Sequence, residues 1–170
     1  VDPRDARDLD AALSRSIARA YGYAKSEQDV GAALAVCSPD FVLDTPALGI
    51  TGRGRDEVAL QLGMFFETFP DYRFEGEGCA AEDGAVAFWG RVRMTFGGAF
   101  LGLAPTGQKV DMPAMSVFRQ HGAALASETF FIDLATLAEQ MGVPVDAMRA
   151  QLALLQPAEP VALAAAGGAR

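Results

Sequence analysis

The spacing of apolar residues in this 170-residue chain changes from helical to alternating near Phe69 and returns to helical after Ile132. Up to Phe69, apolar side chains recur every three to four residues, which is the period of a helix with one buried face. From Tyr72 to Ile132 they alternate with polar residues, as in a strand buried on one side. Helices followed by a run of antiparallel strands indicate an α+β fold, and the chain length suits a single domain.

The pattern predicts five helices and five strands. Helices are expected over residues 6–24, 29–36, 55–69, 134–141 and 145–155, and strands over 41–43, 72–81, 85–96, 109–119 and 123–132. Asp29 is expected to cap the second helix by accepting from its first-turn amides. Residues 51–54 and 97–107 are expected to be loops. A curved sheet wrapped on these helices would leave a concave pocket between sheet and helices.

Charge and cysteine content exclude several classes of protein. The chain has 22 acidic and 14 basic residues, a net charge of −8, which argues against a nucleic-acid or membrane partner because phosphate binding needs a basic patch. Two cysteines, Cys37 and Cys79, are too few for a disulfide framework or a zinc site, and both are expected to be reduced core thiols. We see neither a membrane-spanning run nor a signal peptide, so a cytoplasmic protein is expected.

Four short motifs, in this order, resemble the SnoaL-like polyketide cyclases of the NTF2-like superfamily. They are Gly54-Arg55-Asp56-Glu57-Val58, Phe69-Pro70-Asp71-Tyr72, Gly102-Leu103-Ala104-Pro105-Thr106-Gly107, and Asp133 followed by Glu139-Gln140-Met141-Gly142. The resemblance covers residues 6–142. It implies the NTF2-like cone, a curved antiparallel or mixed sheet packed on three to four helices around an internal pocket. It also implies two segments, an NTF2-like SnoaL-type domain over 1–142 and an appended amphipathic helix with a flexible tail over 143–170.

The resemblance further implies a lyase or isomerase without metal or organic cofactor. Its substrate would be a hydrophobic, polyketide-like cyclic carbonyl compound, and its reaction an aldol cyclisation or a related isomerisation, dehydration or epoxide opening. Such chemistry needs only one acid or base, one or two hydrogen-bond donors and a dry wall.

The family's catalytic pair is not matched in this chain. By alignment of the motifs, the catalytic aspartate of the cyclases falls on Thr129 or Phe130, and the pocket histidine falls on Ser116. A comparison with ketosteroid isomerase matches its oxyanion tyrosine to Tyr21 and brings its base next to Asp44. Two alternatives to an enzyme therefore remain: a non-catalytic module that binds an apolar small molecule, and a structural dimer with a filled core.

Five side chains are candidates for an acid, a base or a donor. Tyr21 lies on the core face of the first helix and can donate to a carbonyl, or it is a core tyrosine. Asp44 and Asp133 each end a strand, where they can act as base or acid, or instead hold a turn and cap a helix. Ser116 has the parity of a cavity-facing donor. Glu128 has the opposite parity to Asp133, so it faces inward only if a bulge shifts the register.

Alternation along the strands also predicts a cavity wall and an outer sheet face. The expected substrate-binding wall is Phe65, Phe88, Val92, Met94, Phe96, Met112, Phe118, Thr129 and Phe131. On the opposite face of one strand, Trp89 lies beside Arg91 and Arg93, and Trp and Arg are enriched at interfaces. Related cone folds often dimerise through this face. The expected partners are therefore a hydrophobic small molecule and a second copy of the chain.

Overall fold

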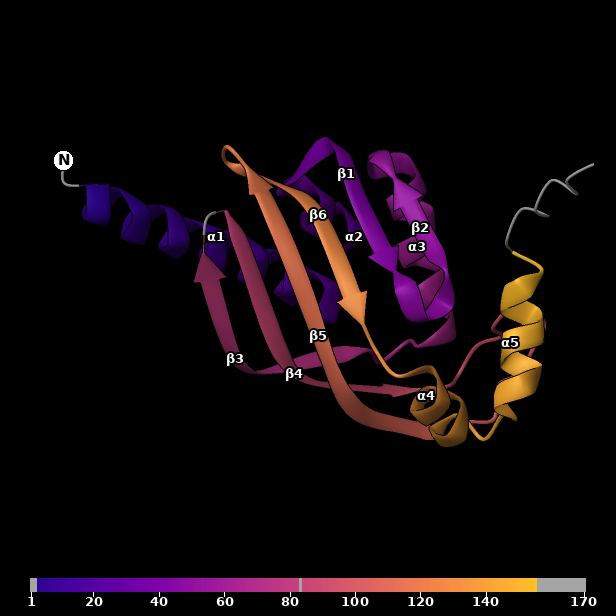
Figure 1. Ribbon diagram of the computed structural model, residues 1–170. Helices are drawn as coiled ribbons and strands as arrows, with labels where there is room; N and C mark the ends of the chain where they lie inside the picture. Colours follow the sequence, from indigo (N-terminus) through magenta and orange to yellow (C-terminus); the bar gives the residue numbers. More distant parts are fainter. Residues whose placement is uncertain (1–2, 83, 156–170) are drawn as a thin grey trace, which may run out of the picture.

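A computed structural model describes residues 3–82 and 84–155, and in it a six-stranded sheet curves around helices on its inner side (Figure 1). The helices are α1 (Pro3–Ser26), α2 (Val30–Ala35), α3 (Gly54–Thr68), α4 (Leu134–Gln140) and α5 (Val145–Ala153), with a short 3₁₀ helix η1 (Pro46–Leu48). The strands are β1 (Cys37–Thr45), β2 (Ile50–Arg53), β3 (Arg73–Glu82), β4 (Ala85–Thr95), β5 (Lys109–His121) and β6 (Ala124–Phe131). The α+β prediction is confirmed.

The sheet is mixed, with the strand order β2-β1-β6-β5-β4-β3. Only β1 and β6 pair in parallel among these strands, and the other neighbours are antiparallel. This pairing brings β1, which follows the first two helices, next to the last strand of the sheet. Side chains from the two ends of the domain therefore meet on the inner face.

The inner face of the sheet is covered by α1, α2 and α3, while α4 and α5 lie at the end where β4 and β5 bend (Figure 1). Helix α1 buries Ala18, Tyr21 and Ala24, and its N-terminal half projects beyond the sheet edge. As predicted, Asp29 caps α2, and its Oδ1 accepts from the Ala32 N–H at 2.8 Å. Within the described parts of the chain, no helix is both long and apolar enough to cross a membrane.

The core lies between these helices and the inner side chains of the strands. The alternation predicted for β4 and β5 is confirmed. The buried residues of these strands include Val92, Met94, Val110, Met112, Ala114, Ser116 and Phe118, while Trp89 and Arg93 lie on the outer face. Helix α5 adds Met148 and Leu152 to the same core. Residues 156–170, which form the tail of the predicted 143–170 segment, lie outside the described residues.

The first two strands differ from the prediction. Strand β1 extends beyond residues 41–43, and residues 50–53 form β2 instead of a loop. Pro39 lies within β1 at a place where the ladder with β6 shifts register, between Cys37 and Val42, so the missing proline N–H removes no ladder hydrogen bond there. In β2, a Cβ at Gly52 would lie 2.4 Å from Gln61 Oε1, and glycine therefore lets this strand approach α3.

A register shift in the last strand, β6, determines which of its side chains face the interior. The ladder between β5 and β6 changes register just after Leu125, which is a bulge. Beyond it Glu128 and Phe130 are buried, whereas Thr129 is only partly buried and Phe131 is 40% exposed. The prediction that Thr129 and Phe131 line the cavity is therefore wrong, because one extra residue moves the following side chains to the opposite face.

Candidate active site

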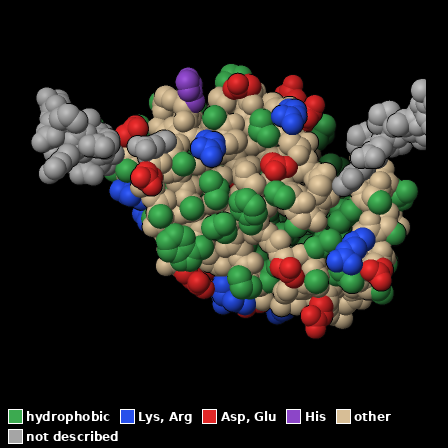
Figure 2. Space-filling model, in the orientation of Figure 1, with side chains coloured by type: hydrophobic (Ala, Val, Ile, Leu, Met, Phe, Trp, Pro, Cys, Tyr) green, Lys and Arg blue, Asp and Glu red, His purple; other side chains and the backbone are tan. Residues whose placement is uncertain are grey.

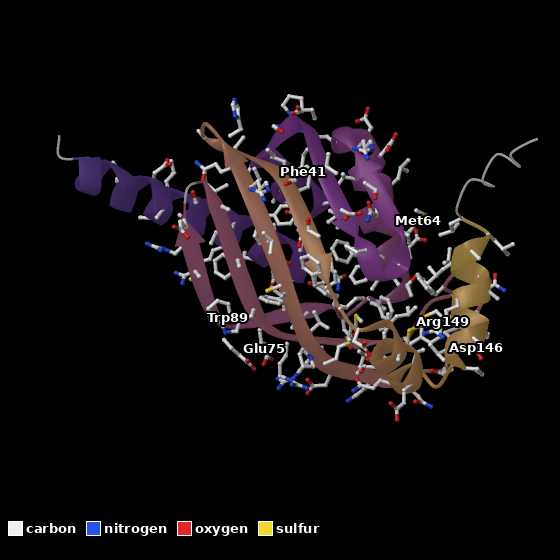
Figure 3. The ribbon with its side chains drawn as sticks, viewed as in Figure 1. Phe41, Met64, Glu75, Trp89, Asp146 and Arg149 are labelled. Carbon is white, nitrogen blue, oxygen red and sulfur yellow. The ribbon has the colours of Figure 1, made fainter. Side chains whose placement is uncertain are left out.

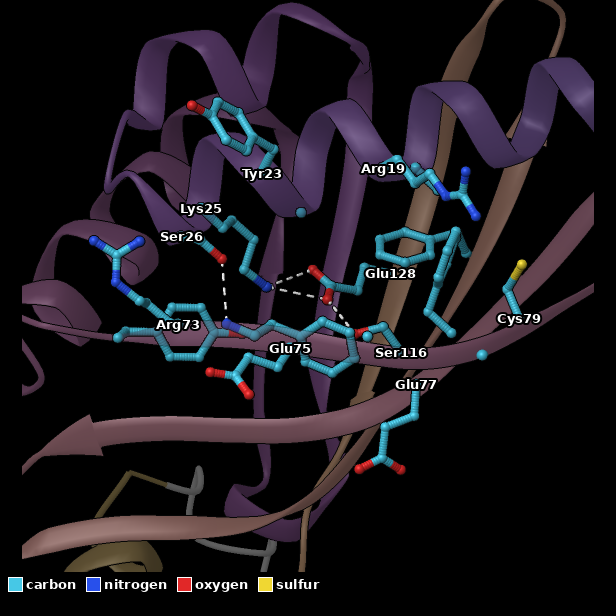
Figure 4. Close-up of a pocket in the computed structure, with 18 of the residues that line it drawn as sticks. Arg19, Tyr23, Lys25, Ser26, Arg73, Glu75, Glu77, Cys79, Ser116 and Glu128 are labelled. Carbon is cyan, nitrogen blue, oxygen red and sulfur yellow. Dashed lines mark hydrogen bonds and ion pairs between the residues drawn. The ribbon is translucent and has the colours of Figure 1, made fainter.

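A buried ion pair joins the first helix to the last strand. Lys25 Nζ on α1 lies 2.9 Å from Oε2 and 3.0 Å from Oε1 of Glu128 on β6 (Figure 4). The two residues are 6% and 1% exposed. Ser116 on β5, which is also buried, donates its Oγ–H to Glu128 Oε1 at 2.7 Å. The carboxylate therefore has both a counter-charge and a hydrogen bond.

Aromatic rings surround the ammonium group of Lys25. Its Nζ lies 5.2 Å from the ring centroids of Tyr21 and Phe130, and 6.0 Å from that of Tyr72. Ring faces attract a cation at such distances, and the attraction is stronger where water is excluded. These contacts offset part of the hydration that Lys25 loses on burial, and they hold its position.

A cavity of about 640 Å³ lies between α1 and β3 (Figure 4). We call it the polar cavity, because seven charged residues border it. These are Arg19, Lys25, Glu27, Arg73, Glu75, Glu77 and Glu128. The Phe74 N–H donates to Ser26 Oγ at 3.2 Å and so holds β3 against α1 beside this cavity.

The second cavity, of about 520 Å³, borders α3, and we call it the apolar cavity. Its lining is mainly hydrophobic and includes Leu43, Leu62, Phe65, Phe69, Met94, Phe100 and Phe130. Lys25 and Tyr72 line both cavities. Lys25 thus lies in the wall between a polar and an apolar space, and its partner Glu128 borders the polar one.

The profile of the SnoaL-like polyketide cyclase family matches residues 15–141 of this sequence. The chain belongs to that family. The matched residues include α1 from residue 15, the whole sheet and α4. They therefore include Lys25, Ser116 and Glu128, which form the buried hydrogen-bonded cluster. The SnoaL-like assignment agrees with the resemblance carried by the four sequence motifs.

Solved structures share the fold of this SnoaL-like chain at low sequence identity. A proposed SnoaL-like polyketide cyclase from Jannaschia sp. CCS1 is 19% identical, with a TM-score of 0.72 over 79% of this chain and 94% of that one. A proposed polyketide cyclase from Xanthomonas campestris is 20% identical, with a TM-score of 0.72 over 78% and 98%. A protein of ketosteroid isomerase-like fold from Catenulispora acidiphila, solved with trimethylamine, is 17% identical, with a TM-score of 0.68 over 76% and 95%. No curated protein is significantly similar.

These likenesses show the NTF2-like cone, as predicted, and the predicted wall residues divide between its two cavities. Phe65 and Met94 line the apolar cavity, and Phe88 and Phe118 line the polar one. Three others, Val92, Phe96 and Met112, are buried in the core and line neither. The predicted single wall is thus partly core packing, because burial of a strand face does not distinguish a filled interior from a hollow one.

Asp44 and Asp133 do not lie at either cavity, so their predicted place in the pocket is wrong. Asp133 is exposed and caps α4, where its Oδ1 accepts from the Thr136 N–H at 2.7 Å. That backbone hydrogen bond is the main cause of its lowered pKa. Asp44 accepts from Thr51 Oγ1 at 2.6 Å across the β1–β2 pair. Both carboxylates therefore serve local hydrogen bonding at strand ends.

Tyr21 is a core residue in this SnoaL-like chain. Its ring packs against Phe41 and Phe118 at centroid distances of 5.6 and 5.7 Å, and it lines neither cavity. Within residues 3–82 and 84–155, its buried hydroxyl has no hydrogen-bond partner. Burial, and then the negative charge of Glu128, raise the Tyr21 pKa well above its ordinary value. The hydroxyl therefore keeps its proton.

Lys25 was not among the residues predicted for the site. A usable indication was present, because Lys25 follows Tyr21 by four residues and so falls on the same helix face. A charged residue on a core face is rare unless it is paired, and such a residue points to a buried partner elsewhere in the chain. The orientation of Ser116 and the conditional orientation of Glu128 were predicted and are confirmed.

The described residues include no group of three or more His, Cys, Asp or Glu side chains that could hold a metal ion. Both cysteines are free thiols. Cys37 is buried, as predicted, and burial raises its pKa from 9.0 to about 12. Cys79 is only partly buried and lines the polar cavity, which differs from the predicted core position.

Proposed function

We propose that this SnoaL-like chain is a cofactor-independent enzyme that acts on a hydrophobic, polyketide-like carbonyl compound by acid/base chemistry. The observation that carries the proposal is the buried Lys25–Glu128 pair in the wall between the two cavities. The free energy needed to remove two charges from water can exceed the free energy gained from their mutual attraction. A buried ion pair is therefore not explained by a contribution to stability alone. A buried, paired acid and base beside a pocket is a recognised pattern of functional sites.

The apolar cavity would take the hydrocarbon body of the substrate and exclude water from it. Two of the three N–H donors of Lys25 are taken up by Glu128, which leaves one for a substrate carbonyl oxygen. The ammonium group then stabilises the negative charge that develops on this oxygen as an enolate forms. In a dry site this attraction is stronger than in water.

Glu128 would move the proton. Its carboxylate accepts a proton from the carbon next to the polarised carbonyl, and Ser116 keeps it oriented through the 2.7 Å hydrogen bond. The enolate carbon can then attack a second carbonyl of the same molecule and close a ring, and the oxygen of that carbonyl takes the proton held by Glu128. Isomerisation or dehydration would use the same two groups, so the reaction class follows from the substrate that fits the apolar cavity.

A non-catalytic binding module is the second candidate, and one observation favours it. Glu128 lines the polar cavity but not the apolar one. A ligand confined to the apolar cavity would meet Lys25 without meeting the carboxylate. In that case Lys25 only fixes the carbonyl of the ligand, and no proton moves.

The proposed assembly is a homodimer formed through the outer face of the sheet. Trp89, Met115 and Phe131 are directly paired across β4, β5 and β6, and are 42%, 36% and 40% exposed. Hydrophobic side chains gather on this face (Figure 2), and Trp89 lies on the outside of the sheet (Figure 3). A contiguous exposed apolar row of this kind is typical of an interaction surface.

The test measures binding and conversion of fused-ring aromatic ketones and β-diketones. We expect the wild type to bind and convert at least one of them, by calorimetry and mass spectrometry. Lys25→Met should lower affinity about tenfold or more, through loss of a charged hydrogen bond. Glu128→Gln should retain binding but lower turnover by about 10²–10⁴.

Asp133→Asn, which lies outside both cavities, is the matched control and should behave like the wild type. Circular dichroism shows which variants are folded. Binding without conversion by every variant would favour the binding module. If no compound of this class binds the wild type, the proposal is wrong.

A further inference from the structure

We propose that Lys25 is a covalent catalyst, whose Nζ forms an iminium ion with the carbonyl carbon of the substrate while Glu128 transfers the protons. The inference rests on the proposed function, because it needs a carbonyl compound in the apolar cavity. It adds one role to those of the proposed function: the Lys25 amine would act as a nucleophile as well as a hydrogen-bond donor. The substrate class would be aldehydes and ketones with at least one hydrogen on the neighbouring carbon.

The first observation in support is that the buried cation paired with Glu128 is a lysine and not an arginine. The sequence contains 12 arginines and only two lysines, Lys25 and Lys109. The one buried cation among the described side chains is nevertheless a lysine, while Lys109 is exposed. Either cation could pair with Glu128 through charge, and arginine is the usual choice for a buried pair. Only lysine can lose a proton and attack a carbonyl.

The second support is the position of Glu128. An ammonium group is not a nucleophile, so a reactive lysine needs a nearby acceptor for its proton. Both carboxylate oxygens of Glu128 lie within 3.0 Å of Nζ, which is within reach for direct transfer. Transfer converts two buried ions into two neutral groups, and burial favours neutral groups over ions. Ser116 keeps its hydrogen bond to Oε1 throughout.

The reaction balances with these groups and water alone. Glu128 takes a proton from Lys25 Nζ, and the neutral amine adds its electron pair to the carbonyl carbon. The carbonyl oxygen receives the proton that the nitrogen releases, which gives a neutral carbinolamine. Glu128 returns its proton to the carbinolamine hydroxyl, the C–O bond breaks, and water leaves. The products are an iminium ion on Lys25 and an ionised Glu128, so the charge is the same as at the start.

The iminium ion makes the next step easier than in the ketone itself. It withdraws electrons from the neighbouring C–H bond, and Glu128, which is ionised again, can take that proton to form an enamine. The enamine carbon can attack a second carbonyl of the same substrate, whose oxygen takes the proton that Glu128 holds, so Glu128 is ionised again. Water then adds to the regenerated iminium ion and frees Lys25.

The surroundings of Nζ suit both stages. The rings of Tyr21, Tyr72 and Phe130 face the ammonium group and would stabilise the iminium cation by the same attraction. The polar cavity, lined by Glu128 and Ser116, offers a place for the water that is released and later consumed. The apolar cavity keeps the substrate body on the other side of Lys25.

Reductive trapping on the full chain tests the inference. The wild type is incubated with 2-naphthaldehyde and sodium cyanoborohydride at neutral pH, and the labelled lysine is located by peptide mass spectrometry. We expect a naphthylmethyl group on Lys25 at least about ten times faster than on Lys109, because a probe held in the cavity reacts at a high effective concentration. Lys109 and the N-terminal amine are internal controls in the same sample.

Two variants give a second comparison. Lys25→Arg keeps the positive charge opposite Glu128 but cannot form an imine, so it should bind the probe, by fluorescence, without being trapped at residue 25. Lys109→Arg should be trapped at Lys25 like the wild type. The wild-type labelling pattern needs no variant and remains decisive even if Lys25→Arg fails to fold.

The trapping experiment distinguishes a failure of covalent catalysis from a failure of the proposed acid/base function. If the wild type binds 2-naphthaldehyde but labels Lys109 as fast as Lys25, covalent catalysis is wrong and the proposed acid/base function is untouched. If the probe does not bind and Lys25 is not labelled, this inference is overturned, and the absence of binding also counts against the apolar cavity as a carbonyl site.

Discussion

Lys25 and Glu128 lie 103 residues apart in the sequence, and their side chains meet at 2.9 Å on the inner face of the sheet. The pair links the first helix to the last strand through the interior. Each partner is the principal compensation for the burial of the other.

Replacing one partner should be far more harmful than replacing both. Glu128→Leu leaves an unpaired buried ammonium group, and we expect it to lower the free energy of unfolding by about 3–5 kcal/mol. The double variant Lys25→Met/Glu128→Leu should regain most of this loss, because it removes both charges. Urea denaturation measures all three proteins.

The exposed pair of Arg93 and Glu75, with side chains 51% and 52% exposed, supplies the control. Water screens this pair, so Glu75→Gln should lower the free energy of unfolding by less than about 1 kcal/mol. Equal losses from Glu128→Leu and Glu75→Gln would contradict the prediction.

The unpartnered hydroxyl of Tyr21 predicts an unusual outcome for a core substitution. Tyr21→Phe removes a buried polar group that has no hydrogen bond in the described structure, so the free energy of unfolding should stay the same or rise by about 1 kcal/mol. Ser116→Ala, which removes the hydrogen bond to Glu128, should instead lower it by about 1.5–3 kcal/mol. A clear loss of stability in Tyr21→Phe would mean that the hydroxyl is bonded after all.

The free energy of unfolding should fall at high pH because the pKa of the Cys37 thiol is raised in the folded chain. Its pKa is about 12 in the folded chain against an ordinary value of 9.0, so above pH 9 the unfolded chain releases a proton that the folded chain retains. This favours unfolding as pH rises, and the stabilising contribution is complete below pH 9 and lost through pH 12. Between pH 8 and 10, the wild type should lose about 1 kcal/mol more than Cys37→Ala. Chemical denaturation at each pH measures this.

Ser38→Ala is the matched truncation for this experiment, because it alters the neighbouring position and leaves the thiol in place. It should show the same pH dependence as the wild type. Parallel curves for the wild type and Cys37→Ala would argue against a perturbed thiol.

The outer row of Trp89, Met115 and Phe131 predicts the oligomeric state. If two copies associate through it, Met115→Asp places a charge at the centre of the interface and should convert dimer to monomer in analytical ultracentrifugation. Leu60→Asp, at a side chain 69% exposed on α3, is the control and should leave the dimer intact. A monomeric wild type, or a dimer that survives Met115→Asp, would rule out this surface.

Much of the fold was predictable because the responsible interactions are local. The change from helical to alternating spacing near Phe69 separates α3 from β3–β6, and the return to helical spacing after Ile132 marks α4 and α5. The inner faces of β4 and β5 followed from strand geometry alone, and the Asp29 cap depends on an amide only three residues away. The short motifs indicated the family. These features repeat within a few residues, so a single sequence contains them.

The site could be predicted only in part. Ser116 was placed correctly by parity, but the inward turn of Glu128 depends on a bulge beside Leu125, and a bulge is a property of paired strands. Asp44 and Asp133 had the right chemistry, yet hydrogen bonds to Thr51 and Thr136 hold them away from the cavities. Burial patterns also could not separate the residues that fill the core from those that border a cavity.

The sequence alone thus determined the order of the helices and strands except β2, the inward-facing residues of β4 and β5, and the SnoaL-like family. The tertiary structure decided which carboxylate faces inward, that Lys25 is its partner, and how the interior divides into a polar and an apolar cavity. The reason is physical: hydrophobic periodicity reports which face of an element is buried. The contact between Lys25 and Glu128 depends on how elements 103 residues apart are packed, and no local pattern records that.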